Sequence, residues 1–152
     1  VWLEQPAEPL TQPWPLRIVD NEINGIHGLL KGDVDKDGKV DLLANSGQPT
    51  GAFANSAAWL RVPKEPRQSP RWERYIFAQS DAPGLSHYLG FGDVNGDGRP
   101  DLLVNSILGG TPIFINEGHL RFRESQRLNA GHGGMSLALA DVDGDGWLDL
   151  RG

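Results

Sequence analysis

The sequence contains no cysteine, only one methionine and no long apolar run. Without cysteine the chain has neither disulfide bonds nor thiolate ligands, which makes zinc an unfavourable metal. No apolar run approaches the roughly 20 residues of a membrane-spanning helix. The sequence as it starts at Val1 shows no signal-like segment, and since its ends look cut this indicates little about export. It has no helical periodicity and carries none of the G-x-S-x-G, P-loop, H-E-x-x-H or dinucleotide motifs.

Glycine and proline are abundant, with 20 and 11 of the 152 residues. Because they do not follow a collagen period, they indicate many tight turns between short strands. The 38% of apolar residues allows one domain with a core. The composition therefore predicts an all-β fold.

The formal net charge of −6 is concentrated in a few places. Eleven of the 20 acidic residues lie in three short segments. The rest of the chain has nine acidic residues, fewer than the 14 basic residues of the whole sequence. This distribution argues against nucleic-acid binding. Three bound divalent cations would bring the formal charge to zero.

The three acidic segments are repeats of one motif. GDVDKDGKVDLLANS at 32–46 returns as GDVNGDGRPDLLVNS at 92–106, and its first part returns as ADVDGDGWLDL at 140–150. The first aspartates of the repeats are separated by 60 and 48 residues. A unit of this length holds the four strands of one propeller blade.

Apolar and β-branched runs bounded by glycine, proline and asparagine predict the strands. The expected strands are 1–4, 15–19, 28–33, 40–45, 56–62, 72–78, 87–92, 101–106, 111–116, 120–125, 135–140 and 147–151. They divide the chain into a half blade (1–20), a blade (21–78), a second blade (79–128) and a half blade (129–152). Propellers close with four to eight blades. The chain, whose ends look cut, is therefore expected to be a fragment of a larger, roughly seven-bladed propeller, or a protomer that closes the ring by self-association.

Each repeat contains the loop D-x-[DN]-x-D-G-x-x-D between its first two strands, at 33–41, 93–101 and 141–149. Positions 1, 3 and 5 offer side-chain oxygens, position 7 a backbone carbonyl and position 9 another carboxylate. A flexible, all-oxygen cage suits calcium better than magnesium. The predicted ligands are Asp33, Asp35, Asp37, Lys39 and Asp41 in the first loop, Asp93, Asn95, Asp97, Arg99 and Asp101 in the second, and Asp141, Asp143, Asp145, Trp147 and Asp149 in the third, with Lys39, Arg99 and Trp147 contributing carbonyls.

Two alternatives compete with this interpretation of the loops. An EF-hand requires a glutamate at position 12 and flanking helices, but this chain has Ala44, Val104 and Gly152 there and strand-like flanks. The aspartates could instead serve only as turn formers. Three copies in register favour the metal site over turns alone.

The segments GDVDKDGKVDLL, FGDVNGDGRPDLLV and LADVDGDGWLDL, supported by PIFINEGHLRFRE, resemble the FG-GAP or VCBS repeat family, the calcium-loop propeller blades of integrin heads and many secreted bacterial proteins. The resemblance covers nearly the whole chain. It implies propeller blades and up to three structural calcium ions, one in each loop. It implies less about activity, because the fold hosts adhesion, scaffolding and carbohydrate enzymes. By loop charge the third site should bind calcium most tightly.

Two histidines supply the second functional hypothesis. His27 and His87 stand six residues before the first aspartate of their loops, where the third repeat has Met135 with His132 nearby. They could line a central channel as a catalytic or second metal site, or they could pack between blades. The chain would in the first case be the scaffold of a carbohydrate-active lyase or dehydratase. The five tryptophans fit packing between blades better than sugar stacking, because Trp2 matches Trp59 and Trp14 matches Trp72.

The leading expectation is a non-catalytic, calcium-stabilised propeller module that presents its surface to a protein or carbohydrate partner. Loops of this kind fill only where calcium reaches about 10⁻⁴ to 10⁻³ M. The expected location is therefore extracellular or periplasmic. No nucleophile with an accompanying base can be named from the sequence.

Overall fold

The computed structural model describes residues 1–79, 88–105, 110–119, 121–129 and 137–151. Every regular element within these residues is a β-strand. The described part of the chain contains no helix long and apolar enough to cross a membrane. Four antiparallel sheets form, two with four strands and two with two strands. The all-β prediction is confirmed.

The two larger sheets are consecutive meanders, each the shape of a propeller blade. Blade 1 contains β3 (Ile26–Gly32), β4 (Asp41–Ser46), β5 (Ser56–Arg61) and β6 (Glu73–Gln79), hydrogen-bonded in chain order. Blade 2 contains β7 (Tyr88–Gly92), β8 (Asp101–Asn105), β9 (Thr111–Gly118) and β10 (Arg121–Leu128) in the same order. The two inner strands are the most apolar, and they are the most buried.

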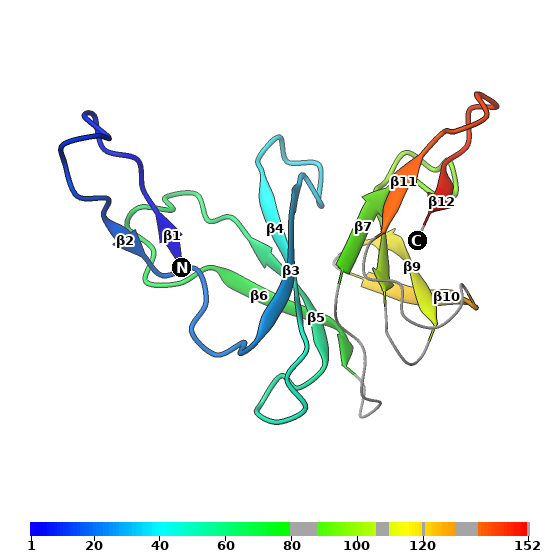
Figure 1. Cartoon of the computed structure of the whole chain (residues 1–152), viewed down its shortest axis with the longest axis horizontal. Helices are drawn as coiled ribbons and strands as arrows, with labels where there is room; N and C mark the ends of the chain where they lie inside the picture. Colours follow the sequence, from blue (N-terminus) through cyan, green and yellow to red (C-terminus); the bar gives the residue numbers. More distant parts are fainter. Residues whose placement is uncertain (80–87, 106–109, 120, 130–136, 152) are drawn as a thin grey trace.

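Two short strand pairs flank the blades. The N-terminal pair joins β1 (Trp2–Leu3) to β2 (Leu16–Arg17), and the C-terminal pair joins β11 (Ala138–Ala140) to β12 (Asp149–Arg151). Figure 1 shows these pairs at opposite ends of the molecule, with the blades side by side between them. No closed ring of blades is formed by the part of the chain that the structure describes.

The predicted strands are present, with adjusted ends. The first two shrink from 1–4 and 15–19 to two residues each, because they pair only through Trp2 with Arg17 and Leu3 with Leu16. The last strand of blade 2 runs to Leu128 instead of 125, since it pairs along the whole of β9 through a bulge between Glu124 and Gln126. Positions 87, 106, 120, 135 and 136 of the predicted strands lie outside the described residues.

Alternation along β5 builds two cores on the two faces of blade 1. Ala57 and Trp59 face blade 2 and pack with Leu89 of β7, Leu102 of β8 and other apolar residues of that blade. Ala58 and Leu60 face the other way, toward the N-terminal pair, where Trp72 completes a second cluster. Stacking each sheet on the next is thus what buries the apolar side chains.

Glycines at the ends of the first strands let the sheets approach closely. A β-carbon on Gly32 would lie 2.2 Å from Cε1 of Phe91, in the next blade. A β-carbon on Gly92 would lie 2.7 Å from Cδ1 of Leu148, in the C-terminal pair. Blade 2 and the C-terminal segment therefore each place an apolar side chain against a glycine of the preceding sheet, where a larger residue would not fit.

Candidate metal-binding loops

The three predicted loops lie at one end of the molecule, at the top of Figure 1. They also touch one another in sequence order. A β-carbon on Gly98 of the second loop would lie 3.5 Å from Nζ of Lys36 in the first. A β-carbon on Gly96 would lie 3.0 Å from the indole of Trp147 in the third loop. The loops thus form one continuous acidic rim.

The first aspartate of each loop organises the turn. Asp33 accepts hydrogen bonds from the backbone N–H of Asp37 at 3.0 Å and of Gly38 at 2.9 Å. Asp37 in turn accepts one from the N–H of Lys39 at 2.9 Å. Gly38 has φ of 85°, a left-handed conformation that costs glycine little. The sequence D-x-D-x-D-G therefore folds as a curl whose amides point at its own carboxylates.

The other two loops repeat this geometry bond for bond. Asp93 accepts from the N–H of Asp97 at 3.1 Å and of Gly98 at 2.7 Å. Asp141 accepts from the N–H of Asp145 at 3.1 Å and of Gly146 at 3.0 Å. The curl is therefore a property of the repeated motif and not of one context.

The curl brings the carboxylates of positions 1, 3 and 5 together. One oxygen from each of Asp33, Asp35 and Asp37 lies within 4.8 Å of the other two. Asp141, Asp143 and Asp145 form an equivalent group, and all three are exposed to solvent. In the second loop Asn95 takes the place of the middle carboxylate and donates its amide to Asp97 at 2.9 Å.

The position-9 aspartates connect the loop to the third strand of the blade. Asp41 accepts hydrogen bonds from the N–H of Val34 at 3.4 Å and of Val62 at 2.8 Å. Asp101 likewise accepts from Val94 at 3.0 Å and from Asn116 at 2.8 Å. Both aspartates are fully buried. Their side chains therefore link the first hairpin of each blade to its third strand or to the residue that follows it.

The electrostatics separate the buried from the exposed carboxylates. Burial raises the pKa of Asp41 and of Asp101, against the lowering effect of their backbone hydrogen bonds. The pKa of exposed Asp97 is lowered instead, by the backbone hydrogen bond from Arg99, then by Asn95 and by the charges of Arg99 and Lys36. Ionised buried carboxylates gain from a nearby positive charge.

Basic side chains contact two of the three loops. In the first loop Arg61, from the end of β5, donates to Asp35 at 2.7 Å and lies 3.6 Å from Asp37. In the second, Arg99 pairs with Asp97 at 2.6 Å. Within the described residues the third loop forms no ion pair. Its four carboxylates therefore have no basic partner among the residues that the structure describes.

Two residues of this region, Arg61 and Asn116, were not predicted from the sequence. Asn116 is buried in β9, and its amide donates to the carbonyls of Val34 at 3.3 Å and Pro100 at 3.1 Å. It thereby joins the second blade to the first loop. Neither residue recurs at the equivalent position of the other blade, so the repeat gave no signal for them.

The remaining candidates are placed as follows. His27 is exposed at the start of β3, while His87, His132 and Met135 lie outside the described residues, so the proposed histidine site stays a prediction. Trp59 and Trp72 are buried in the cores between sheets, as predicted. Trp14 and Trp147 are exposed.

Comparison with protein families agrees with the geometry. The family model for the FG-GAP-like repeat matches residues 33–104 and again 93–150, each match beginning at the first aspartate of a loop. No curated protein matches the chain. Because the matches span more than half of the sequence and the sheets have the expected four-stranded form, the chain belongs to the FG-GAP-like repeat family and is built of its β-propeller blades.

Proposed function

We propose that the chain is a calcium-binding propeller module in which each loop holds one structural calcium ion. The observation that carries this proposal is the convergence of three carboxylate oxygens within 4.8 Å in the first and third loops. The residues would be those predicted from the motif, with positions 1, 3 and 5 forming the centre of each site. Position 9 and the position-7 carbonyl would complete it.

The spacing of the oxygens fits calcium. Ligand oxygens lie about 2.3 to 2.6 Å from a calcium ion, so two of them on one ion are at most about 5 Å apart. Three oxygens mutually within 4.8 Å meet this limit. The donor set contains only oxygen, which suits a hard cation and disfavours zinc or copper.

Calcium is preferred to magnesium because the loops are open and irregular. Magnesium requires a near-ideal octahedron and keeps several of its waters, whereas calcium accepts six to eight ligands in flexible arrangements. The cluster in the third loop is exposed and would leave room for water ligands as well. An extracellular or periplasmic location, where calcium is abundant, follows from such weak sites.

The role we assign to calcium is structural. Each loop connects the first two strands of its sheet, and its position-9 aspartate reaches the third strand in both blades. A cation in the loop would relieve the repulsion among the carboxylates and favour the ionised form of the buried aspartates. The stacked blades would then offer a rigid surface to a protein or carbohydrate partner, which is the binding role proposed for the module.

A calorimetric titration with calcium chloride, repeated with magnesium chloride, tests the proposal. We expect about three calcium ions per chain for the unchanged protein and one fewer for Asp145→Ala, because this change removes a central carboxylate from the third loop. The matched control is Glu65→Ala, which removes an exposed acid between β5 and β6, outside all three loops. It should leave the stoichiometry unchanged.

The titration also ranks the loops. The site lost in Asp145→Ala should be the one that binds calcium most tightly, since the third loop has four aspartates and no basic contact within the described residues. Absence of calcium binding by a folded protein would refute the proposal. Equal dissociation constants for calcium and magnesium would refute the predicted selectivity for calcium.

A further inference from the structure

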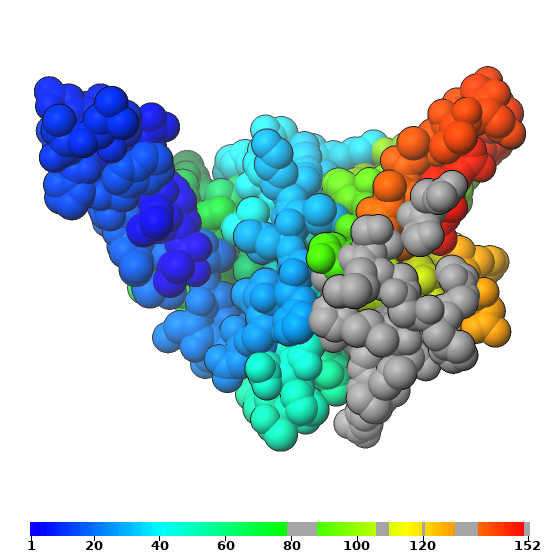
Figure 2. Space-filling view, in the orientation of Figure 1, coloured from blue at the N-terminus to red at the C-terminus, as the bar shows by residue number. Residues whose placement is uncertain are grey.

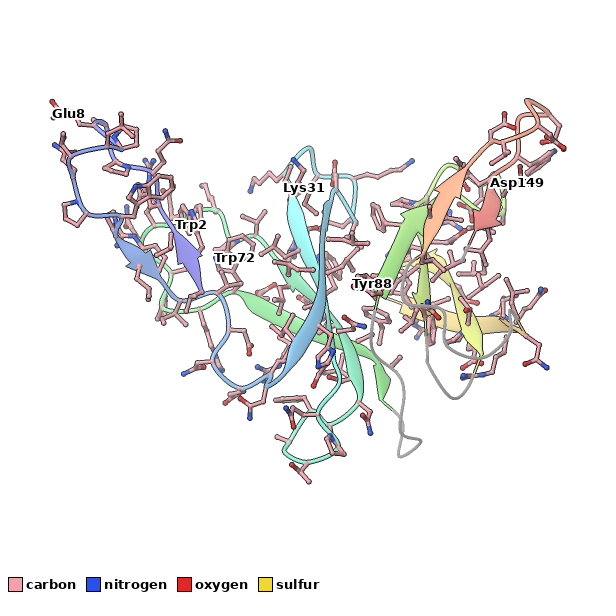
Figure 3. All side chains as sticks on the ribbon, in the orientation of Figure 1. Trp2, Glu8, Lys31, Trp72, Tyr88 and Asp149 are labelled. Carbon is pink, nitrogen blue, oxygen red and sulfur yellow. The ribbon has the colours of Figure 1, made fainter. Side chains whose placement is uncertain are left out.

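A pocket of about 260 Å³ lies at the junction of the two blades. The first loop borders it through Lys36, and the turn between β9 and β10 of blade 2 borders it through Gly118 and His119. Figure 3 shows the first strands of the two blades side by side, β3 with Lys31 and β7 with Tyr88. Figure 2 shows the blades in contact in the middle of the molecule. The pocket is therefore built by both blades together.

The lining of the pocket combines aromatic and basic side chains. Trp59 of β5, which is buried, and Phe122 of β10 supply aromatic surface. Lys36, Arg99 and His119 supply the basic groups. Apolar or aromatic walls with a few convergent charged groups are the usual lining of a small-molecule site. The pocket is therefore a candidate ligand site outside the proposed calcium positions.

Two of these basic residues have a left-handed backbone conformation. Lys36 has φ of 59° and His119 has φ of 49°. This conformation is unfavourable for residues other than glycine and, to a lesser degree, asparagine. Within the described residues the one other non-glycine residue with positive φ is Asn55, an asparagine. Backbone strain of this kind gathers at functional sites, and here both strained basic residues border the same pocket.

The repeats show that the loop does not need a lysine at this position. Position 4 is Lys36 in the first loop but Gly96 and Gly144 in the other two, with φ of 72° and 79°. All three loops form the same hydrogen bonds from their position-6 glycine to their first aspartate. Lysine therefore costs the first loop backbone free energy that glycine would avoid. What it adds is an ammonium group beside the pocket.

The basic groups differ in how far the protein itself already uses them. Arg99 donates to the carbonyl of Asn116 at 2.7 Å and pairs with Asp97 at 2.6 Å, so its guanidinium is fixed in place. Lys36 and His119 form neither an ion pair nor a side-chain hydrogen bond within the described residues. Two basic side chains thus remain available to a ligand, beside a third that is held in position. Their charge favours an anionic ligand.

We propose that this pocket binds a carboxylated sugar, namely a uronic acid residue of a glycan. The carboxylate would lie between Lys36 and His119, and the sugar ring would pack against Phe122. The inference rests on the binding role proposed above, and it gives that role a ligand class and a place in the molecule. Both walls of the pocket belong to four-stranded sheets, so the site is whole within the described residues.

The two kinds of lining together select a sugar acid over other anions. A uronic acid has an apolar C–H face that packs on an aromatic ring, and a carboxylate at its edge. The acidic side chains of a peptide have the carboxylate without the ring, so they would leave Phe122 uncovered. A neutral sugar has the ring without the carboxylate, so it would leave Lys36 and His119 unpaired. The pocket is smaller than the roughly 300 Å³ at which sites for drug-sized ligands begin, which limits the ligand to about one ring.

A titration followed by NMR of the isotope-labelled protein tests the proposal, with sodium glucuronate as the probe and glucose and sodium acetate as controls. It is carried out in calcium chloride, because Asp35 lines the pocket and its negative charge opposes an anion. Glucuronate should give saturable shifts of the amide signals of Lys36, Gly118 and His119. Binding of glucose, which lacks the carboxylate, and of acetate, which lacks the ring, should each be about tenfold weaker.

Two glycine variants separate binding from stability. Lys36→Gly and His119→Gly should each weaken glucuronate binding about tenfold, yet keep or raise the melting temperature, because glycine relieves the left-handed strain. If the two side chains had only a structural role, both variants would lower the melting temperature. Lys64→Gln is the control, since it removes an exposed lysine between β5 and β6 that does not line the pocket.

Three results would overturn the inference: no saturable shifts at the pocket, acetate binding as tightly as glucuronate, or unchanged affinity in both glycine variants. Acetate binding of that strength would indicate recognition of a bare carboxylate, as in an acidic peptide. Calcium stoichiometry is measured separately by calorimetry. A protein that binds calcium but not glucuronate would therefore refute the sugar site and leave the calcium proposal standing.

Discussion

At the scale of single residues, Arg61 at the end of β5 partly neutralises the negative charge of the first loop. Its guanidinium contacts Asp35 and Asp37, two of the three carboxylates that would bind calcium. The same contacts raise the pKa of Arg61 in spite of its partial burial. A bound calcium ion would compete with Arg61 for these oxygens. The arginine would therefore stabilise the metal-free loop and weaken the affinity for calcium that we propose for it.

Replacing Arg61 by glutamine should strengthen calcium binding by the first loop. We expect a gain of about two- to fivefold, because an exposed ion pair contributes up to about 1 kcal/mol. Calorimetry in the background Asp97→Ala with Asp145→Ala would isolate this loop. Arg17→Gln, which removes an arginine that pairs with Glu4 in the N-terminal strand pair, is the control. Unchanged or weaker binding would show that Arg61 does not compete with the ion.

Asp20 is a second residue whose charge matters to the fold. It accepts hydrogen bonds from the backbone N–H of Glu22 and Ile23, both at 2.8 Å, and it pairs with Arg74, which stacks on Phe53. Burial alone would raise the pKa of Asp20, but these hydrogen bonds and the arginine lower it below 3.8. The ion pair ties the segment after β2 to β6.

Asp20→Asn should destabilise the protein in a pH-dependent way. Since the pKa is lower in the folded state, the charge of Asp20 stabilises the fold above about pH 3.8 and ceases to do so as the pH falls below it. We expect a loss of about 1 to 3 kcal/mol in unfolding free energy at pH 7 that shrinks as the pH falls below 3.8. Urea unfolding in chelator, with Glu65→Gln as control, measures it. A loss independent of pH would contradict the assigned charge effect.

At the scale of elements, the contact between consecutive sheets depends on a glycine facing an apolar side chain. Gly32 faces Phe91, and Gly92 faces Leu148 and Leu139. Leu139 stands at the position of Phe91 in the third repeat. The chain thus uses both an aromatic and an aliphatic residue for the same purpose.

Gly32→Ala should destabilise the junction of the two blades, because its methyl group would overlap the ring of Phe91. Overpacking of this kind costs about 1 to 3 kcal/mol. Gly32→Ala should cost less stability in a Phe91→Leu background than in the unchanged protein, since the third repeat has leucine at this position. Thermal unfolding of the four proteins completes the cycle. Additive losses would show that the two side chains do not meet.

The elements were largely predictable from the sequence, and the reasons are local. Alternating apolar residues and D-G turns specify strands and hairpins within a few residues, and the repeat confirms each assignment three times. The curl of the loops was predictable for the same reason. The pairing of Arg61 with Asp35 was not, because it joins residues on different strands with no repeated spacing. The link from Asn116 to Val34 crosses from one blade to the next and left no trace in either segment.

At the scale of the whole molecule, the sheets stack in a row whose two ends are both open. The three loops lie along one side of this row, at the top of Figure 1. Within the described residues, basic side chains pair with the first two loops and not with the third. A bound cation would therefore add most to the stability of the third loop.

Thermal unfolding in calcium chloride and in chelator tests the central claim most directly, because that claim is a structural role for calcium. Mass action on the folded state contributes about 2.7 kcal/mol for each site at a hundredfold excess of calcium over its dissociation constant. The account predicts a higher melting temperature in calcium, with a smaller difference for Asp145→Ala. Coincident unfolding curves of the unchanged protein in the two buffers would contradict it.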